Sequence, residues 1–137
     1  MPLIYKEAFA RYGVKLTNVA WSVSALTPTG DLVVSLWTTN LRFDGVARTL
    51  TYSDSLAGWK GNALGREEFR RHLQHVQKSG QAVRLITARP RTPAEEAKVG
   101  RIQDESVIAK DFDVRPDLVG ALVAFDGDSY CFEFRQH

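Results

Sequence analysis

The chain has 137 residues, of which 44% are hydrophobic and 25% charged, and its formal net charge is +2. These values are ordinary for a globular protein, so we expect a single domain over residues 1–137. No apolar run approaches the ~20 residues that a membrane-spanning helix needs. Residues 1–7 lack the pattern of a secretory signal, and a lone cysteine, Cys131, cannot form an internal disulfide. We therefore expect a cytoplasmic protein with no membrane partner.

Charge is distributed unevenly along the sequence. Residues 65–101 carry nine Lys or Arg against four Asp or Glu, whereas residues 102–137 carry three against eight. A basic block of this kind can mark a face for a polyanion. The alternative is that the two segments neutralise each other across the fold.

The first half of the chain predicts a short helix followed by an antiparallel meander. Apolar residues recur at spacings of three and four over residues 3–12, which is typical of a short amphipathic helix, and Gly13 could end it. Three stretches follow in which apolar and other residues alternate, as in half-buried strands. Residues typical of turns separate them at Pro28–Asp31 and Asp44–Gly45. The predicted strands are residues 19–27, 32–38 and 46–52.

The second half predicts a longer helix and a terminal hairpin. Residues 53–65 read as a glycine-rich loop around Trp59, and the helix follows over residues 66–78. Phe69, Leu73 and Val76 form its apolar stripe, which must face the core. Asp126–Asp128 supplies the turn of the hairpin. The other predicted elements are strands over residues 81–88, 118–125 and 130–135, a basic loop over residues 89–93 and a helical turn over residues 94–98.

These elements define the expected fold class. Strands joined by tight turns, with two helices inserted rather than alternating, predict an α+β fold. We expect a mainly antiparallel, partly closed sheet or a small barrel with two helices. A doubly wound parallel sheet would need a crossover helix between successive strands, and the terminal hairpin leaves no room for one.

Motifs of covalent catalysis and of nucleotide hydrolysis are missing. Cys131 lies within an apolar strand, where cysteine is usually a small buried hydrophobe. No Gly-x-Ser-x-Gly elbow surrounds a serine, and the glycines of residues 58–65 fit neither the Walker nor the dinucleotide spacing. His72 and His75 could share a helix face, but neighbouring cations would repel a metal ion. We therefore predict no catalytic residue, no metal ligand and no cofactor.

Two carboxylates near the C-terminal hairpin support an alternative. Pro116-Asp117 and Glu133-Phe134-Arg135 resemble the Pro-Asp…Glu-x-Lys signature of metal-dependent restriction-type nucleases, in which paired carboxylates hold Mg²⁺. The sequence departs from that signature at Arg135, because arginine cannot lose a proton as lysine can.

A second resemblance covers residues 35–48. Ser35-Leu36-Trp37 through Phe43-Asp44-Gly45-Val46-Ala47-Arg48 resembles the strand–turn–strand of PUA-like domains of the EVE and YTH type. The resemblance implies a small mixed β-barrel that reads modified nucleobases in an aromatic cage, of the kind found in restriction systems. By that analogy Trp21, Trp37 and Trp59 are candidate cage residues.

The predicted function is a non-catalytic binding domain that recognises nucleic acid or a modified base, because a basic block lies beside aromatic-bearing strands. Trp37 and Trp59 are the candidates for stacking on a ligand. The alternatives are packing of Trp37 with Trp21 across paired strands and anchoring of the loop by Trp59. Besides the nuclease, a small-ligand or protein-interaction module with no nucleic-acid role remains open. The candidate phosphate-binding residues are Arg66, Arg70, Arg71, Arg89 and Arg91.

Overall fold

The computed structural model describes residues 3–136. Within this range the chain forms three α-helices and eight strands, which confirms the α+β class. The helices are α1 (Tyr5–Ala10), α2 (Ala63–Ser79) and α3 (Pro93–Glu96). The strands are β1 (Ser24–Leu26), β2 (Leu32–Trp37), β3 (Arg42–Asp44), β4 (Thr49–Ser55), β5 (Val83–Pro90), β6 (Lys110–Val114), β7 (Leu118–Phe125) and β8 (Ser129–Gln136).

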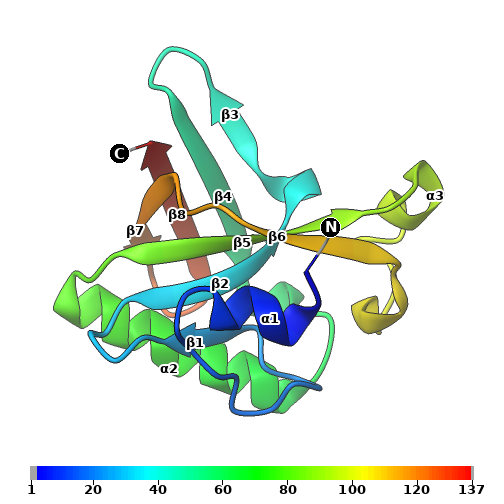
Figure 1. Ribbon diagram of the computed structural model, residues 1–137, viewed down its shortest axis with the longest axis horizontal. Coiled ribbons are helices and arrows are strands. Elements are labelled where there is room, and N and C mark those ends of the chain that lie inside the picture. Colours follow the sequence, from blue (N-terminus) through cyan, green and yellow to red (C-terminus); the bar gives the residue numbers. More distant parts are fainter. Residues whose placement is uncertain (1–2, 137) are drawn as a thin grey trace.

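All eight strands of the described residues belong to one mixed sheet. Its order is β1-β2-β5-β7-β8-β4-β3, and β6 pairs with β5 outside this path. The pairing of β2 with β5 is parallel and the other strand pairs of the described residues are antiparallel, so the sheet is mainly antiparallel as predicted. The sheet is not closed into a barrel. Its two ends, β1 and β3, lie far apart in Figure 1.

Strand β5 joins the two parts of the sheet. Val83 at its start pairs with Gly120 of β7, whereas residues 86–90 pair with β6. Figure 1 shows β5 crossing the middle of the molecule and continuing toward α3 at one end. A single strand can serve two neighbours on one side in this way because each uses a different half of its length.

The helices α1 and α2 cover opposite faces of the sheet. Val34 and Leu36 of β2 pack in the core cluster that contains α2, while Val33 packs in the cluster that contains Phe9 of α1. Successive side chains of a strand point to opposite faces, so the alternation along β2 separates the two clusters. Only the face under α2 carries the candidate site described below.

The apolar stripe of α2 is placed as predicted. Phe69, Leu73 and Val76 are buried, at 2%, 0% and 2% exposure. The helix begins three residues earlier than predicted, because the side chain of Asn62 accepts a hydrogen bond from the Leu64 backbone N–H at 2.7 Å and caps it. Gly80 ends it in the left-handed conformation, with φ 72°. No helix within residues 3–136 is both long and apolar enough to cross a membrane.

The prediction of a strand over residues 19–27 is largely wrong, because only Ser24–Leu26 is extended. Asn18 accepts backbone hydrogen bonds from Trp21 and Ser22, and its side chain accepts one from Ala20. These bonds hold residues 18–22 in a turn. Trp21 therefore lies outside the strand and does not pair across it with Trp37.

The predicted meander is correct for its first hairpin, in which β1 pairs antiparallel with β2, and wrong beyond it. The third strand runs over residues 49–55 rather than 46–52, and it pairs with β3 and β8 instead of β2. Part of the predicted basic loop, residues 89–90, continues β5 and pairs with β6, a strand that the sequence did not predict. The structure contains the two expected helices and also a third, α3, where a helical turn was predicted.

Candidate functional site

A cavity of about 150 Å³ lies on the α2 face of the sheet, beside the N-terminal part of α2. Its wall combines core residues from β4, β8 and α2 with the ends of two loops. Five aromatic residues contribute to the lining: Trp37, Tyr52, Trp59, Phe69 and Tyr130. Both tryptophans predicted to stack on a ligand therefore line one cavity.

The aromatic side chains contact one another around this cavity. The Trp59 and Phe69 rings lie 5.6 Å apart between centroids, and Phe69 meets Tyr130 edge to face at 5.2 Å. Tyr52 stacks on Tyr130 at 6.3 Å. These contacts hold the four rings in place, so this part of the wall is already formed before a ligand binds.

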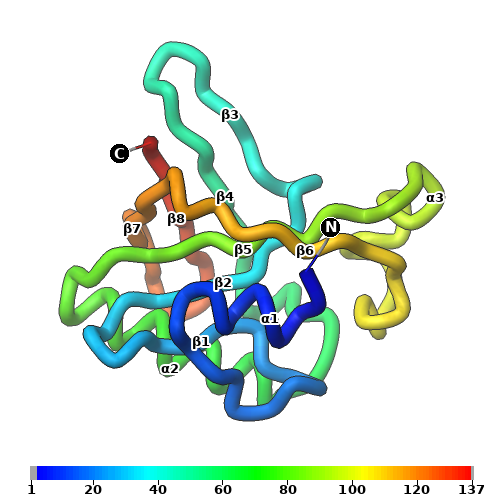
Figure 2. The backbone as a smooth tube through the Cα atoms, viewed as in Figure 1, coloured from blue at the N-terminus to red at the C-terminus, as the bar shows by residue number. Residues whose placement is uncertain are grey.

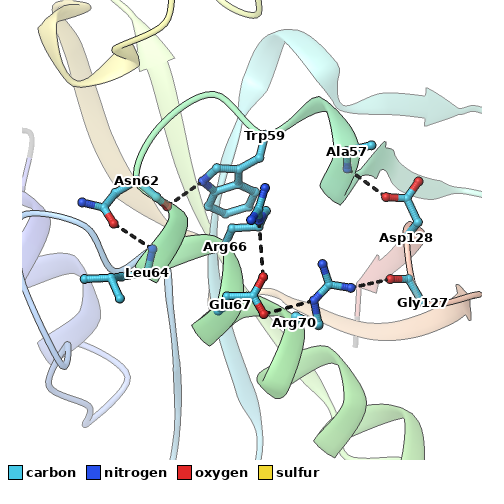
Figure 3. A network of polar contacts seen from close by, with 9 residues as sticks. All are labelled: Ala57, Trp59, Asn62, Leu64, Arg66, Glu67, Arg70, Gly127 and Asp128. Carbon is cyan, nitrogen blue, oxygen red and sulfur yellow. Dashed lines mark hydrogen bonds and ion pairs between the residues drawn. The ribbon is translucent and has the colours of Figure 1, made fainter.

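The loop that carries Trp59 is anchored at both ends (Figure 3). The indole N–H of Trp59 donates to the backbone carbonyl of Asn62 at 3.2 Å. The start of the loop is held against the β7–β8 turn, because the Ala57 backbone N–H donates to the Asp128 carboxylate at 2.8 Å. Arg70 of α2 donates to the Gly127 carbonyl of the same turn at 2.9 Å. Trp59 thus anchors its loop and lines the cavity at once.

A second loop closes the cavity near Trp37. The backbone N–H of Gly100 donates to the Glu105 carboxylate at 2.6 Å, which fixes the segment that contributes Val99, Gly100 and Glu105 to the wall. Lys110 lies over the Trp37 ring at 5.1 Å from its centroid. Burial lowers the pKa of the Lys110 ammonium, against the opposing effect of Glu105 and Asp104.

The cavity wall also contains polar groups. The Tyr52 hydroxyl donates to the Asp54 carboxylate at 3.4 Å. Burial first, and then Asp54, raise the pKa of Tyr52 above its ordinary value, so the hydroxyl stays protonated and keeps its donor. Lys60 and Asn40 also line the cavity, and no ion pair of Lys60 is found among residues 3–136. The site therefore offers acceptors and donors beside flat apolar surfaces, which suits a polar heterocycle.

The five candidate arginines fall into two groups and one single residue. Arg66 and Arg70 of α2 share Glu67, each at 3.4 Å (Figure 3). Arg71 is exposed and has no ion pair in the described part of the chain. Each group has more arginines than carboxylates, so positive charge is left over at both places.

The second group lies at the end of β5. Arg91 contacts Asp111 at 2.9 Å and Arg89 contacts the same carboxylate at 3.8 Å. Trp37 pairs with Ala88 next to this group, which brings it toward the Trp37 side of the cavity. The arginines of α2 lie toward its Trp59 side.

The carboxylates of the alternative nuclease site are each paired with their own arginine. Arg115 holds Asp117 through two hydrogen bonds of 3.0 and 2.9 Å and lowers the pKa of that carboxyl. Arg135 contacts Glu133 at 2.8 Å. Glu133 is opposite Ala121, four residues beyond Asp117, which corresponds to about 13 Å along the strand. Within residues 3–136 no group of three His, Cys, Asp or Glu side chains could hold a metal ion.

A buried polar cluster between α2 and β1 was missed by the sequence analysis. The Ser24 hydroxyl and the His72 ring nitrogen Nδ1 lie 2.7 Å apart. Glu68 is only 3% exposed, and its Oε1 has no hydrogen-bond partner in the described structure. Its burial follows from helix phase, because Glu68 sits one turn before His72 on the buried side. None of these residues lines the cavity.

Comparisons of the chain with protein-family models, with curated proteins and with solved structures find no significant match. The resemblance of residues 35–48 to PUA-like domains therefore stays a prediction. In the structure this segment contains the end of β2, all of β3 and the turn that follows it.

Proposed function

We propose that this protein is a non-catalytic binding domain that takes one nucleobase of a nucleic acid, such as a modified base, into the aromatic cavity. The observation that carries the proposal is the meeting of Trp37 and Trp59 in one cavity with Tyr52 and Tyr130. Stacking on aromatic side chains is how proteins commonly hold an unpaired base, since every base has a flat π-face.

The size of the cavity supports one ring system rather than a larger ligand. Pockets for drug-sized ligands typically have volumes of about 300–1,000 Å³. The cavity here, at about 150 Å³, has room for a single small heterocycle. The sugar and phosphates of a nucleotide would then stay outside, where Lys60 and the arginines of α2 are available.

Charge on α2, outside the cavity, supports a polyanionic ligand. The cavity wall itself carries Lys60 against Asp54 and Glu105. On α2, Arg66 and Arg70 together outnumber the Glu67 carboxylate that they share, and Arg71 has no ion pair within the described residues. Neutralising phosphates releases condensed counterions, so binding driven by these residues must weaken steeply as salt rises.

The test is a titration of labelled single- and double-stranded oligonucleotides at low and high salt. We expect binding at about 50 mM salt that falls by orders of magnitude at about 200 mM. Trp59→Ala should weaken binding by roughly 5- to 100-fold, the usual effect of removing a stacked aromatic. No binding of any oligonucleotide at low salt contradicts the proposal.

Two arginine variants separate a specific face from general charge. Arg71→Ala should reduce the slope of log K against log salt by about one phosphate contact. Arg11→Ala is the matched control, because Arg11 is exposed at the end of α1, which covers the opposite face of the sheet. An equal change of the salt slope in both variants would argue against nucleic-acid binding on the α2 face. Binding of a free base with no affinity for oligonucleotides would identify a small-ligand module instead.

A further inference from the structure

The hairpin of β3 and β4 projects from the body of the protein and ends in exposed apolar side chains. Figures 1 and 2 show it extending away from both covering helices. Phe43 is 70% exposed and Val46, in the turn, is 98% exposed. Large apolar side chains at the end of a protruding ribbon gain free energy when a partner covers them.

The turn of this hairpin contains an unusual residue. Arg48 has φ 59°, in the left-handed region that favours glycine, and is the one residue other than glycine with positive φ among those described. Asp44 holds the turn, because its carboxylate accepts from the Val46 and Ala47 backbone N–H groups at 2.9 and 3.0 Å and its carbonyl accepts from the Arg48 N–H at 2.7 Å. Glycine would adopt this conformation at a lower conformational cost than arginine does.

The charge of the hairpin fits a polyanion. Arg42 and Arg48 are exposed on either side of Phe43, and neither has an ion pair within residues 3–136. Asp44 is the one carboxylate between them, so residues 42–48 carry a net charge of +1. Beside the turn of the hairpin, Arg135 donates to the Ala47 carbonyl and contacts Glu133, so this Arg–Glu pair is neutral.

Phe43 lies on the same face of the sheet as the cavity. It pairs with Leu50 in β4, and Leu50 and Tyr52 point to the same face because they are two residues apart. Tyr52 lines the cavity. Two residues of a strand span about 7 Å, so along the strand Phe43 lies about two base-pair rises beyond Tyr52 of the cavity wall.

We propose that this hairpin is a wedge that enters a nucleic-acid duplex. Phe43 stacks in the space that a base leaves as it moves into the aromatic cavity, and Arg42 and Arg48 bind the flanking phosphates. Apolar side chains inserted between base steps, with arginines beside them, are a known way to unstack a duplex. The inference rests on the proposed function and adds to it the kind of substrate, a duplex that must be opened.

The test uses a duplex with 2-aminopurine beside the target base, since the fluorescence of this analogue rises when it unstacks. The wild-type protein should bind the duplex and increase the fluorescence. Phe43→Ala should remove most of the increase while weakening binding by about tenfold or less. Ile4→Ala, at another exposed apolar residue near α1, is the matched control and should retain both signals.

Arg48→Gly gives a second, independent readout. Glycine relieves the left-handed conformation, so this variant should unfold at a higher denaturant concentration than the wild type. It should nevertheless bind the duplex more weakly, with a salt slope reduced by about one contact. A purely structural role predicts higher stability with unchanged binding, and that result would overturn the inference.

The outcomes separate this inference from the proposed function. If the wild-type protein binds no nucleic acid, the proposed function fails. If it binds and Phe43→Ala unstacks the duplex as well as the wild type does, only the wedge fails. Binding of the protein to vesicles of phosphatidylcholine and phosphatidylserine, lost in Phe43→Ala while the 2-aminopurine signal of the duplex is unchanged, would assign the hairpin to a lipid surface and also refute the wedge.

Discussion

Gly65→Ala tests the packing that positions the cavity. Gly65 is buried in the first turns of α2, and a Cβ added there would overlap the backbone carbonyl oxygen of Trp21. Helix propensity alone predicts that alanine stabilises this position by about 1 kcal/mol. The overlap acts in the opposite direction and is the larger effect, because overpacking costs about 1–3 kcal/mol or more where backbone must move. We expect a net loss of roughly 1–2 kcal/mol.

The change should reach the cavity as well as the core. The added Cβ would also contact the Trp59 ring at 3.8 Å, so moving the start of α2 displaces a cavity wall. Urea unfolding followed by tryptophan fluorescence measures the stability. Gly58→Ala is the control, because a Cβ there meets the Ser55 hydroxyl at an ordinary 3.5 Å. A Gly65→Ala protein as stable as the wild type would show that the approach of α2 to Trp21 is looser than described.

Two further predictions concern α2. Leu73→Ala should lower the free energy of unfolding by about 2–5 kcal/mol, the usual loss for a buried leucine, whereas Arg71→Ala at the surface should change it by about 0.5 kcal/mol or less; urea melts that reverse this order would contradict the helix phase. Burial lowers the pKa of His72, so between that lowered value and its ordinary value of 6.5 the unfolded chain binds more protons than the folded one. The free energy of unfolding should therefore fall as the pH drops below about 6.5. His72→Gln should flatten this dependence in urea melts from pH 5 to 8, with the exposed His75→Gln as control; an unchanged slope in His72→Gln refutes the argument.

The elements that could be predicted are those specified by local sequence. The hairpin of β7 and β8 lies within a residue of its predicted bounds, because an apolar stretch and an alternating one flank an aspartate–glycine turn. The stripe of α2 was also predicted, since its spacing of three and four residues admits one helix face. Both signals lie within stretches of fewer than about twenty residues.

Pairing between distant segments could not be predicted in this way. Strand β6 contains Asp111 and Asp113, and aspartate disfavours a strand. Arg89 and Arg91, from the end of β5 and the residue after it, neutralise Asp111 in the folded protein. The parallel pairing of β2 with β5 depends on a crossover through α2, and nothing in either strand specifies its neighbour. Local propensity was overruled here by tertiary contacts.

The cavity was predicted only in part for the same reason. Trp37 and Trp59 stood out in the sequence by residue type and position. Tyr52 and Tyr130 did not, because the pairing of β4 with β8 brings them together from opposite halves of the chain. The alternation of Leu50, Tyr52 and Asp54 was the available signal, and it was obscured by the strand boundary placed at residue 52.

The position of β8 in the middle of the sheet has a consequence for how the protein folds. Strand β4 pairs with β8 from Thr49↔Arg135 to Ser55↔Ser129, and β7 pairs along the other edge of β8. The edge of β4 that faces β8 is therefore hydrogen-bonded only after residues 129–135 have been synthesised. Sheets that depend on such distant contacts fold slowly, often in milliseconds to seconds. The cavity wall is complete only in that last phase, because Tyr130 reaches it when β8 inserts.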